Sequence, residues 1–322
     1  MRTSIHNLLK EEHLISEEQH AFIDAKAKNP LFSIFWELRV LLFLGVTLLS
    51  SGFGILIYEN IDTIGHHTLI AIIVALCGVC FWYCFKHKKP FSFHLVESPT
   101  PVFDYILLLG CLLFLTLEGY LQFQYNIFGE KYGLATIIPT CAFFFFAYSF
   151  DHKGILGMGI SGLALWFGIA LAPKDIFDGN NYKEINLILS AIGLGVVLIV
   201  AAWQSNKEDF KKHFDFTYLN FGAHLIFISS ILGMINFDYK WAFVLIVGFF
   251  CALFILYAKR EQSFYFLLIA VFYAYFAFTY LFILLAENVD FAFEMFFMYF
   301  IISSAFIIFF FLNYKKFLTN TK

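Results

Sequence analysis

Ten apolar runs, each close to the length of one membrane-crossing helix, divide most of the chain. A spanning helix needs about 20 mainly apolar residues, because the hydrocarbon core is about 30 Å thick and the helix rises ~1.5 Å per residue. We therefore predict an all-α, polytopic transmembrane bundle of about ten helices. The predicted spans are 38–58, 68–85, 101–121, 133–150, 154–172, 185–203, 218–235, 240–258, 264–286 and 291–312.

The composition supports a lipid environment. The chain is 61% hydrophobic and only 14% charged, whereas soluble domains carry about 25% charged residues. A water-soluble fold of this size lacks the polar cover to hide so much apolar surface. The formal net charge of -3 shows no basic excess, so we expect the lipid bilayer, and no nucleic acid, as a partner.

The segment 133–172 is the hardest to divide, because only Asp151-His152-Lys153 interrupts it. One helix over the whole segment would be far too long for a single crossing. A tight hairpin is therefore predicted at residues 151–153. This hairpin decides on which side of the membrane every later loop lies.

Lys and Arg predict the orientation. With the N-terminus inside, 17 of the 21 basic residues fall in the arm, the inner loops and the tail. Such an excess is typical of cytoplasmic loops. We expect both termini in the cytoplasm, and Trp82 and Trp203 at inner membrane boundaries, where aromatic rings are favoured.

Three regions follow from this division: a cytoplasmic arm at 1–36, the transmembrane domain at 37–314 and a cytoplasmic tail at 315–322. Ser16-Glu17-Glu18-Gln19 matches a capping box, in which the first and last side chains bond each other's backbone N–H. We predict amphipathic arm helices at 4–12 and 17–28. The arm either docks a protein partner or packs on the membrane surface, and an amphipathic stripe does not choose between them.

Two stretches, 8–19 and 39–65 (RVLLFLGVTLLSSGFGILIYENIDTIG), together resemble the bacterial multi-pass membrane family called domain of unknown function twenty-one fifty-seven. In that family, the arm has a turn with the sequence Gly-Leu-Ile-Ser/Thr. A first helix that contains glycines follows it and ends in Asn-Trp. Here His13 replaces the glycine and Ile61 follows Asn60. The resemblance covers about the first 70 residues. It implies a bacterial cytoplasmic (inner) membrane and assigns no chemistry.

Ionisable groups inside apolar runs are candidate functional residues, because charge at membrane depth is costly. Glu118 and Gln122 share a face of the third span, near its outer end, and Asp104 lies near its inner end. Glu294 lies one turn into the tenth span. One expectation is that Glu294 and Glu118 face the same outer vestibule. The alternative is that these acids reach to headgroups and water. The predicted outer vestibule adds Glu59, Asn60, Asp62, Glu287 and Asp290.

Three further polar side chains lie deep in spans: His224, Tyr273 and Tyr280. A bis-His haem needs a second His on a facing helix, so a hydrogen-bonded His is favoured. The tyrosine hydroxyls require partners or a cavity. No spacing matches a metal site, and we assign no catalytic residue, metal or cofactor.

Three functions fit this pattern. Small-solute or ion/proton-coupled transport is favoured by the intramembrane carboxylates. A non-catalytic scaffold, docking a protein through residues 1–36, is favoured by the arm and by the scarcity of buried charge. An enzyme for lipid-linked substrates fits least, because such enzymes use polar loops with paired acids or metal ligands, and the predicted loops are short.

Overall fold

The computed structural model describes residues 35–129, 131–171, 185–286 and 292–319, together with Ser16, Glu17 and Gln19. Within those residues the chain is all-helical, which confirms the predicted fold class. The long helices are α3 (Phe35–Ile64), α4 (His66–His87), α5 (Pro101–Tyr125), α6 (Tyr132–Phe150), α7 (Lys153–Leu171), α9 (Ile185–Lys207), α10 (Asp215–Asn236), α11 (Lys240–Arg260), α12 (Phe264–Ala286) and α13 (Ala292–Thr319).

Nine of the helices in the described residues are long and apolar enough to cross a membrane. The tenth is α7, whose described apolar part, Lys153–Gly168, is shorter. Side chains that face outward are largely apolar, among them Leu48, Leu245 and Leu312, each at least 70% exposed. A surface of this kind is stable in lipid and not in water.

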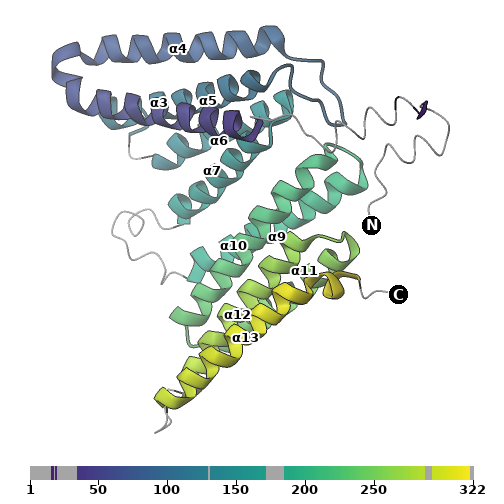
Figure 1. Cartoon of the computed structure of the whole chain (residues 1–322). Coiled ribbons are helices and arrows are strands. Elements are labelled where there is room, and N and C mark those ends of the chain that lie inside the picture. Colours follow the sequence, from purple (N-terminus) through teal and green to yellow (C-terminus); the bar gives the residue numbers. More distant parts are fainter. Residues whose placement is uncertain are drawn as a thin grey trace.

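The helices form two groups of five, α3–α7 and α9–α13 (Figure 1). In the first group α4 packs along α5 and α6 packs along α7; in the second, α9 packs along α10 and α11 along α12. Helix α7 contacts α9 and α10 as well as α5 and α6. It therefore connects the two groups.

The predicted hairpin between α6 and α7 is confirmed. Asp151 adopts a left-handed conformation (φ 61°), which ends α6. Asp tolerates this backbone region better than most residues. The backbone N–H of Ile155 then donates to Nδ1 of His152 at 3.1 Å, which caps the start of α7.

Close helix contacts depend on glycine at two places. A Cβ on Gly162 of α7 would lie 2.3 Å from Oγ1 of Thr140 on α6. A Cβ on Gly195 of α9 would lie 2.9 Å from the carbonyl oxygen of Gly222 on α10, and the reverse contact is equally short. Small residues let backbones approach in this way, since apolar side chains gain nothing from leaving lipid.

Several helices extend past the predicted spans. Helix α3 continues to Ile64, so Glu59, Asn60 and Asp62 lie in helix rather than in a loop. Helix α13 continues to Thr319, so the predicted tail at 315–322 is helical through residue 319. An apolar run marks only the hydrocarbon-crossing part, while backbone hydrogen bonding favours continuing the helix through the headgroup layer.

Part of the predicted arm is described. The backbone N–H of Gln19 donates to Oγ of Ser16 at 3.2 Å, and the backbone N–H of Ser16 donates to Oε1 of Gln19 at 2.9 Å. These reciprocal bonds confirm the capping box. The predicted helices 4–12 and 17–28, apart from these residues, lie outside the described residues, as do Glu287 and Asp290.

Candidate functional site

A cavity of about 1030 Å³ lies between α5, α6 and α7. Most of its wall is apolar, as in ligand sites that use a few polar groups for recognition. The polar side chains on the wall are Glu118, Gln122, Asn126, Tyr132, Thr136, Thr140 and Ser161. The cavity thus brings together two residues that the sequence predicted as a pair, Glu118 and Gln122.

Glu118 is the charged group of this cavity. Its side chain is buried, with 9% of the residue exposed. Its Oε1 atom is inaccessible to water and accepts no hydrogen bond from any residue that the structure describes. A buried carboxylate without partners is costly, and it is stabilised by taking up a proton or by binding a cation. This arrangement makes Glu118 the strongest candidate for a functional residue.

Gln122 lines the cavity with Glu118, and its side chain also bonds to the turn after α5. Its Nε2 donates to Oδ1 of Asn126 and to the carbonyl of Gly129, at 3.0 and 3.1 Å. Its Oε1 accepts from the backbone N–H of Phe128 at 3.0 Å. Gln122 therefore holds the turn that follows α5, and Asn126 of this turn lines the cavity.

Pro139 lies inside α6 and lines the cavity. Proline has no backbone N–H, so the carbonyl of Ala135 loses its helical donor. Ala135 and Pro139 both line the cavity. A carbonyl without its usual donor is a suitable second ligand for a cation or a water molecule near Glu118.

The structure does not bring Glu294 to this cavity. Glu294 is exposed at the start of α13, which packs on α11 and α12 in the other helix group. Asp104 lies near the opposite end of α5 and accepts a hydrogen bond from Oγ of Ser98. The side chains of Glu59, Asn60 and Asp62 lie outside the described residues.

The other deep polar residues predicted from the sequence, His224, Tyr273 and Tyr280, are paired within the second helix group. Nδ1 of His224 lies 2.7 Å from the hydroxyl of Tyr273. The hydroxyl of Tyr280 donates to the carbonyl of Met234 at 3.0 Å. These side chains satisfy one another or the backbone, so a structural role accounts for them.

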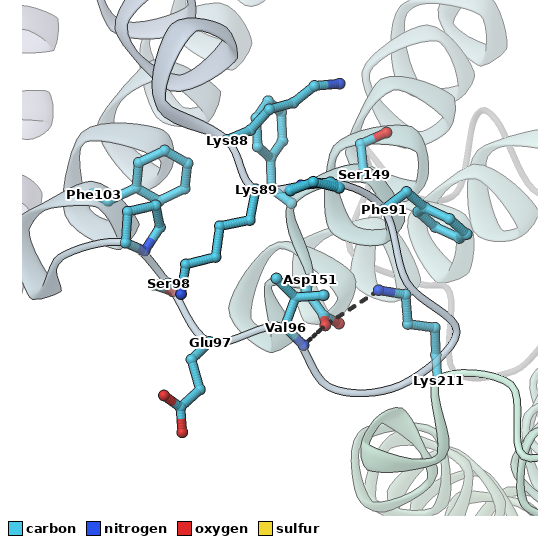
Figure 2. A pocket seen from close by; sticks show the side chains of 13 residues that line it. Lys88, Lys89, Phe91, Val96, Glu97, Ser98, Phe103, Ser149, Asp151 and Lys211 are labelled. Atoms are coloured by element: carbon cyan, nitrogen blue, oxygen red, sulfur yellow. Dashed lines mark hydrogen bonds and ion pairs between the residues drawn. The ribbon is translucent and has the colours of Figure 1, made fainter.

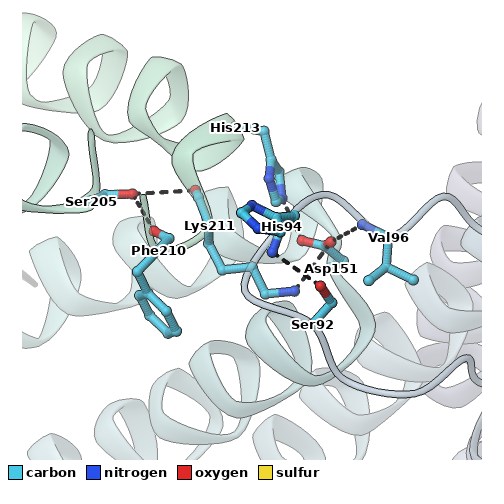
Figure 3. Close-up of polar contacts among 8 residues, drawn as sticks. All are labelled: Ser92, His94, Val96, Asp151, Ser205, Phe210, Lys211 and His213. Atoms are coloured by element: carbon cyan, nitrogen blue, oxygen red, sulfur yellow. Dashed lines mark hydrogen bonds and ion pairs between the residues drawn. The ribbon is translucent and has the colours of Figure 1, made fainter. Parts of the chain in front are cut away.

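A buried ionic cluster that the sequence analysis did not predict joins the two helix groups. Oδ2 of Asp151 lies 3.1 Å from Nζ of Lys211, with the side chains 2% and 1% exposed (Figure 2). The same carboxylate accepts from the backbone N–H of Val96 at 2.5 Å and pairs with Nε2 of His213 (Figure 3). The cluster thus joins the α4–α5, α6–α7 and α9–α10 connections.

Backbone contacts hold Lys211 in place. Its N–H donates to the carbonyl of Phe93 at 2.7 Å. Its own carbonyl and that of Phe210 accept from Oγ of Ser205, at 3.2 and 2.7 Å (Figure 3). The Lys211 ammonium also lies 4.8 Å from the centre of the Phe91 ring. The sequence gives little indication of this buried pair, because Asp151 and Lys211 resemble ordinary charged residues of loops.

The helical bundle, with nine long apolar helices in its described part, is that of a multi-pass membrane protein. A family model described as "Predicted membrane protein (DUF2157)" matches residues 7–156. This part of the chain is therefore similar to that family, and the similarity reaches beyond the predicted 70 residues to the α6–α7 hairpin. No curated protein and no solved structure matches the chain.

Proposed function

We propose that the chain transports a small cation, or a solute coupled to protons, and that Glu118 is the group that takes up the positive charge. The observation that carries the proposal is Glu118, which lines a cavity of about 1030 Å³ and whose buried Oε1 has no hydrogen-bond partner among the residues that the structure describes. A carboxylate at membrane depth is characteristic of proton relays and ion pathways. Ala135, Thr136 and Ser161 line the same cavity, and carbonyl and hydroxyl oxygens suit a positively charged or hydrated ligand.

The test is flux through purified protein in liposomes, driven by a membrane potential and followed with a pH-sensitive dye and with dyes for Na⁺ and K⁺. Glu118→Gln keeps the size and polarity of the side chain but removes its charge. Flux should fall to the background of empty liposomes. Glu294→Gln is the matched control, because it removes an exposed carboxylate from another span, and its flux should equal that of the wild type.

Two results would overturn the proposal. The first is a wild-type protein that is folded in liposomes but moves none of these cations. The second is a Glu118→Gln variant with the flux of the wild type.

We further propose that the end of the bundle with the Asp151 cluster faces the cytoplasm of a bacterial inner membrane. Basic residues gather in the connections at this end, including Lys88, Lys89 and Lys207. The α11–α12 connection meets the end of α13 there, since Nε2 of Gln262 donates to the carbonyl of Leu318 at 2.9 Å. The positive-inside rule then places this end inside. A fluorescent protein fused after Lys322 should be fluorescent, and one that stays dark would reverse the orientation.

The capping box favours a second candidate function, protein docking through residues 1–36. The reciprocal bonds of Ser16 and Gln19 support a helix start in the arm, and an amphipathic helix is a common docking element. Deletion of residues 1–30 should then remove a partner that co-purifies with the full chain. An unchanged set of co-purifying proteins, with the bundle still inserted, would exclude docking by the arm.

A further inference from the structure

A second cavity, of about 480 Å³, lies at the Asp151 end of α5 and α7. Residues of α3 line it, whereas residues of α6 line the Glu118 cavity. Its polar wall consists of Arg39, Thr47, Asp104, Tyr105 and His152. The hydroxyl of Tyr105 donates to the carbonyl of Arg39 at 3.2 Å, which ties α5 to α3 at this wall.

The two cavities meet at Leu112 and Met158, the residues that line both of them. On α5 and on α7 the lining residues recur about once per helical turn, singly or as adjacent pairs, and a helix brings such positions to one face. The lining residues of α5 are 104, 105, 108, 112, 115, 118, 119, 122 and 123, and those of α7 are 154, 158, 161, 162 and 165.

We propose, on the basis of the proposed function, that the two cavities are the halves of one cation path between α5 and α7, and that Leu112 and Met158 form its constriction. The path then runs from the Asp151 end, past Asp104, through the apolar constriction to Glu118. It crosses the span along a single groove, without passing through the second helix group.

The chemistry of the two halves differs. Arg39 and Asp104 place one charge of each sign on the wall of the smaller cavity, so this cavity is a polar vestibule for water and has little preference between ions. The larger cavity contains only the Glu118 charge among its lining residues, and it is the site that selects a cation. An apolar constriction excludes water and ions until it widens.

The constriction is built from side chains that can move. Met has three rotatable side-chain bonds and adapts its shape easily. Met158 and Leu112 are both partly exposed to the cavities. Gly154 lies one turn before Met158 on the same wall and carries no side chain, although the His152 ring packs against it.

The test changes the width of the constriction and measures the same potential-driven flux of H⁺, Na⁺ and K⁺ in liposomes. Met158→Ala and Leu112→Ala should each raise the flux several-fold, and Met158→Trp should abolish it. Met298→Ala is the matched control, since Met298 lies on α13 and is 55% exposed. Its flux should equal that of the wild type. Size-exclusion profiles identify any variant that fails to fold. The two alanine variants widen the constriction independently, one from α5 and one from α7.

The outcomes separate this proposal from the proposed function. If wild-type flux depends on Glu118 but the folded alanine variants conduct like the wild type, the path lies elsewhere and the constriction is wrong. If the wild type shows no flux and the alanine variants show none, the proposed function fails as well. Flux raised by Met158→Ala and again lost in Met158→Ala/Glu118→Gln supports both.

Discussion

The carboxylate of Asp151 and the ammonium of Lys211 lie 3.1 Å apart and are almost completely buried where the two helix groups meet. Asp151 ends α6, and Lys211 lies just before the short 3-10 helix at Lys212–Phe214 that leads into α10. Such a pair offsets the cost of removing two charges from water only when its geometry is good and other bonds satisfy the remaining atoms. Val96 and His213 supply those bonds.

Asp151→Asn should destabilise the protein by about 3–5 kcal/mol, because it leaves the Lys211 charge buried without a counter-charge. Asn tolerates the left-handed backbone at this position, so the change keeps the turn and removes the charge together with one acceptor oxygen. The measurement is the free energy of unfolding in detergent. Glu261→Gln is the control: it breaks the exposed Arg260–Glu261 pair (3.6 Å) and should cost at most about 1 kcal/mol. Equal losses in the two variants would contradict a buried role for Asp151.

We predict that His152 makes the protein less stable in mild acid. Burial lowers the pKa of His152 below its ordinary value of 6.5, although the Asp104 carboxylate and a backbone hydrogen bond partly oppose the shift. As the pH falls below 6.5, the unfolded chain binds a proton sooner than the folded chain does. The stability that is fully present above pH 6.5 is therefore lost as the pH approaches the lowered pKa.

The measurement is the thermal midpoint between about pH 7.5 and about pH 5.5, where histidine titrates. His152→Asn is the comparison, because Asn still caps α7 through the Ile155 N–H but carries no proton in this range. The wild type should lose more stability than the variant on acidification. Parallel pH curves would rule out His152 as the source.

Gly162→Ala should destabilise the α6–α7 pair by about 1–3 kcal/mol, the usual cost of overpacking. The new Cβ would lie 2.3 Å from Oγ1 of Thr140, and that hydroxyl already donates to the carbonyl of Thr136 at 2.7 Å. Gly193→Ala is the control, since a Cβ there meets nothing within 4 Å. Helix propensity alone should make it neutral or slightly stabilising. A stable Gly162→Ala variant would show that the two helices can separate without cost.

Tyr273→Phe should cost about 1 kcal/mol, since it removes the hydroxyl that lies 2.7 Å from Nδ1 of His224. Hydrogen bonds between membrane helices are worth amounts of this order. Tyr239→Phe is the control, because Tyr239 is 75% exposed. The measurement is the free energy of unfolding of both variants in detergent. A Tyr273→Phe variant as stable as Tyr239→Phe would mean that His224 finds another partner.

The features that the sequence predicted well are local. The capping box needs only Ser16 and Gln19, three positions apart, and the hairpin needs only a polar break at Asp151 within a run too long for one crossing. Glu118 was found for a related reason: an ionisable residue inside an apolar run stands out from its neighbours. Each of these signals lies within one helix or one turn.

The features that it missed join segments far apart in the chain. Lys211 looked like one more basic loop residue, and nothing near it in the sequence points to Asp151. The expected vestibule of Glu118 and Glu294 required knowing which helices are neighbours. A periodic pattern shows which residues share a face of one helix, but it does not show which helix that face meets.

The sequence by itself determined that this chain forms a multi-helix membrane bundle, because the cost of burying unpaired backbone groups in lipid leaves a long apolar run no alternative to the helix. Only the tertiary structure decided where the cavity lies and which charges pair. In lipid, helices choose neighbours by close packing, through contacts such as that of Gly162 with Thr140, and such fits depend on shape rather than on hydrophobicity. The pairing of Asp151 with Lys211 and the isolation of Glu118 both follow from that packing.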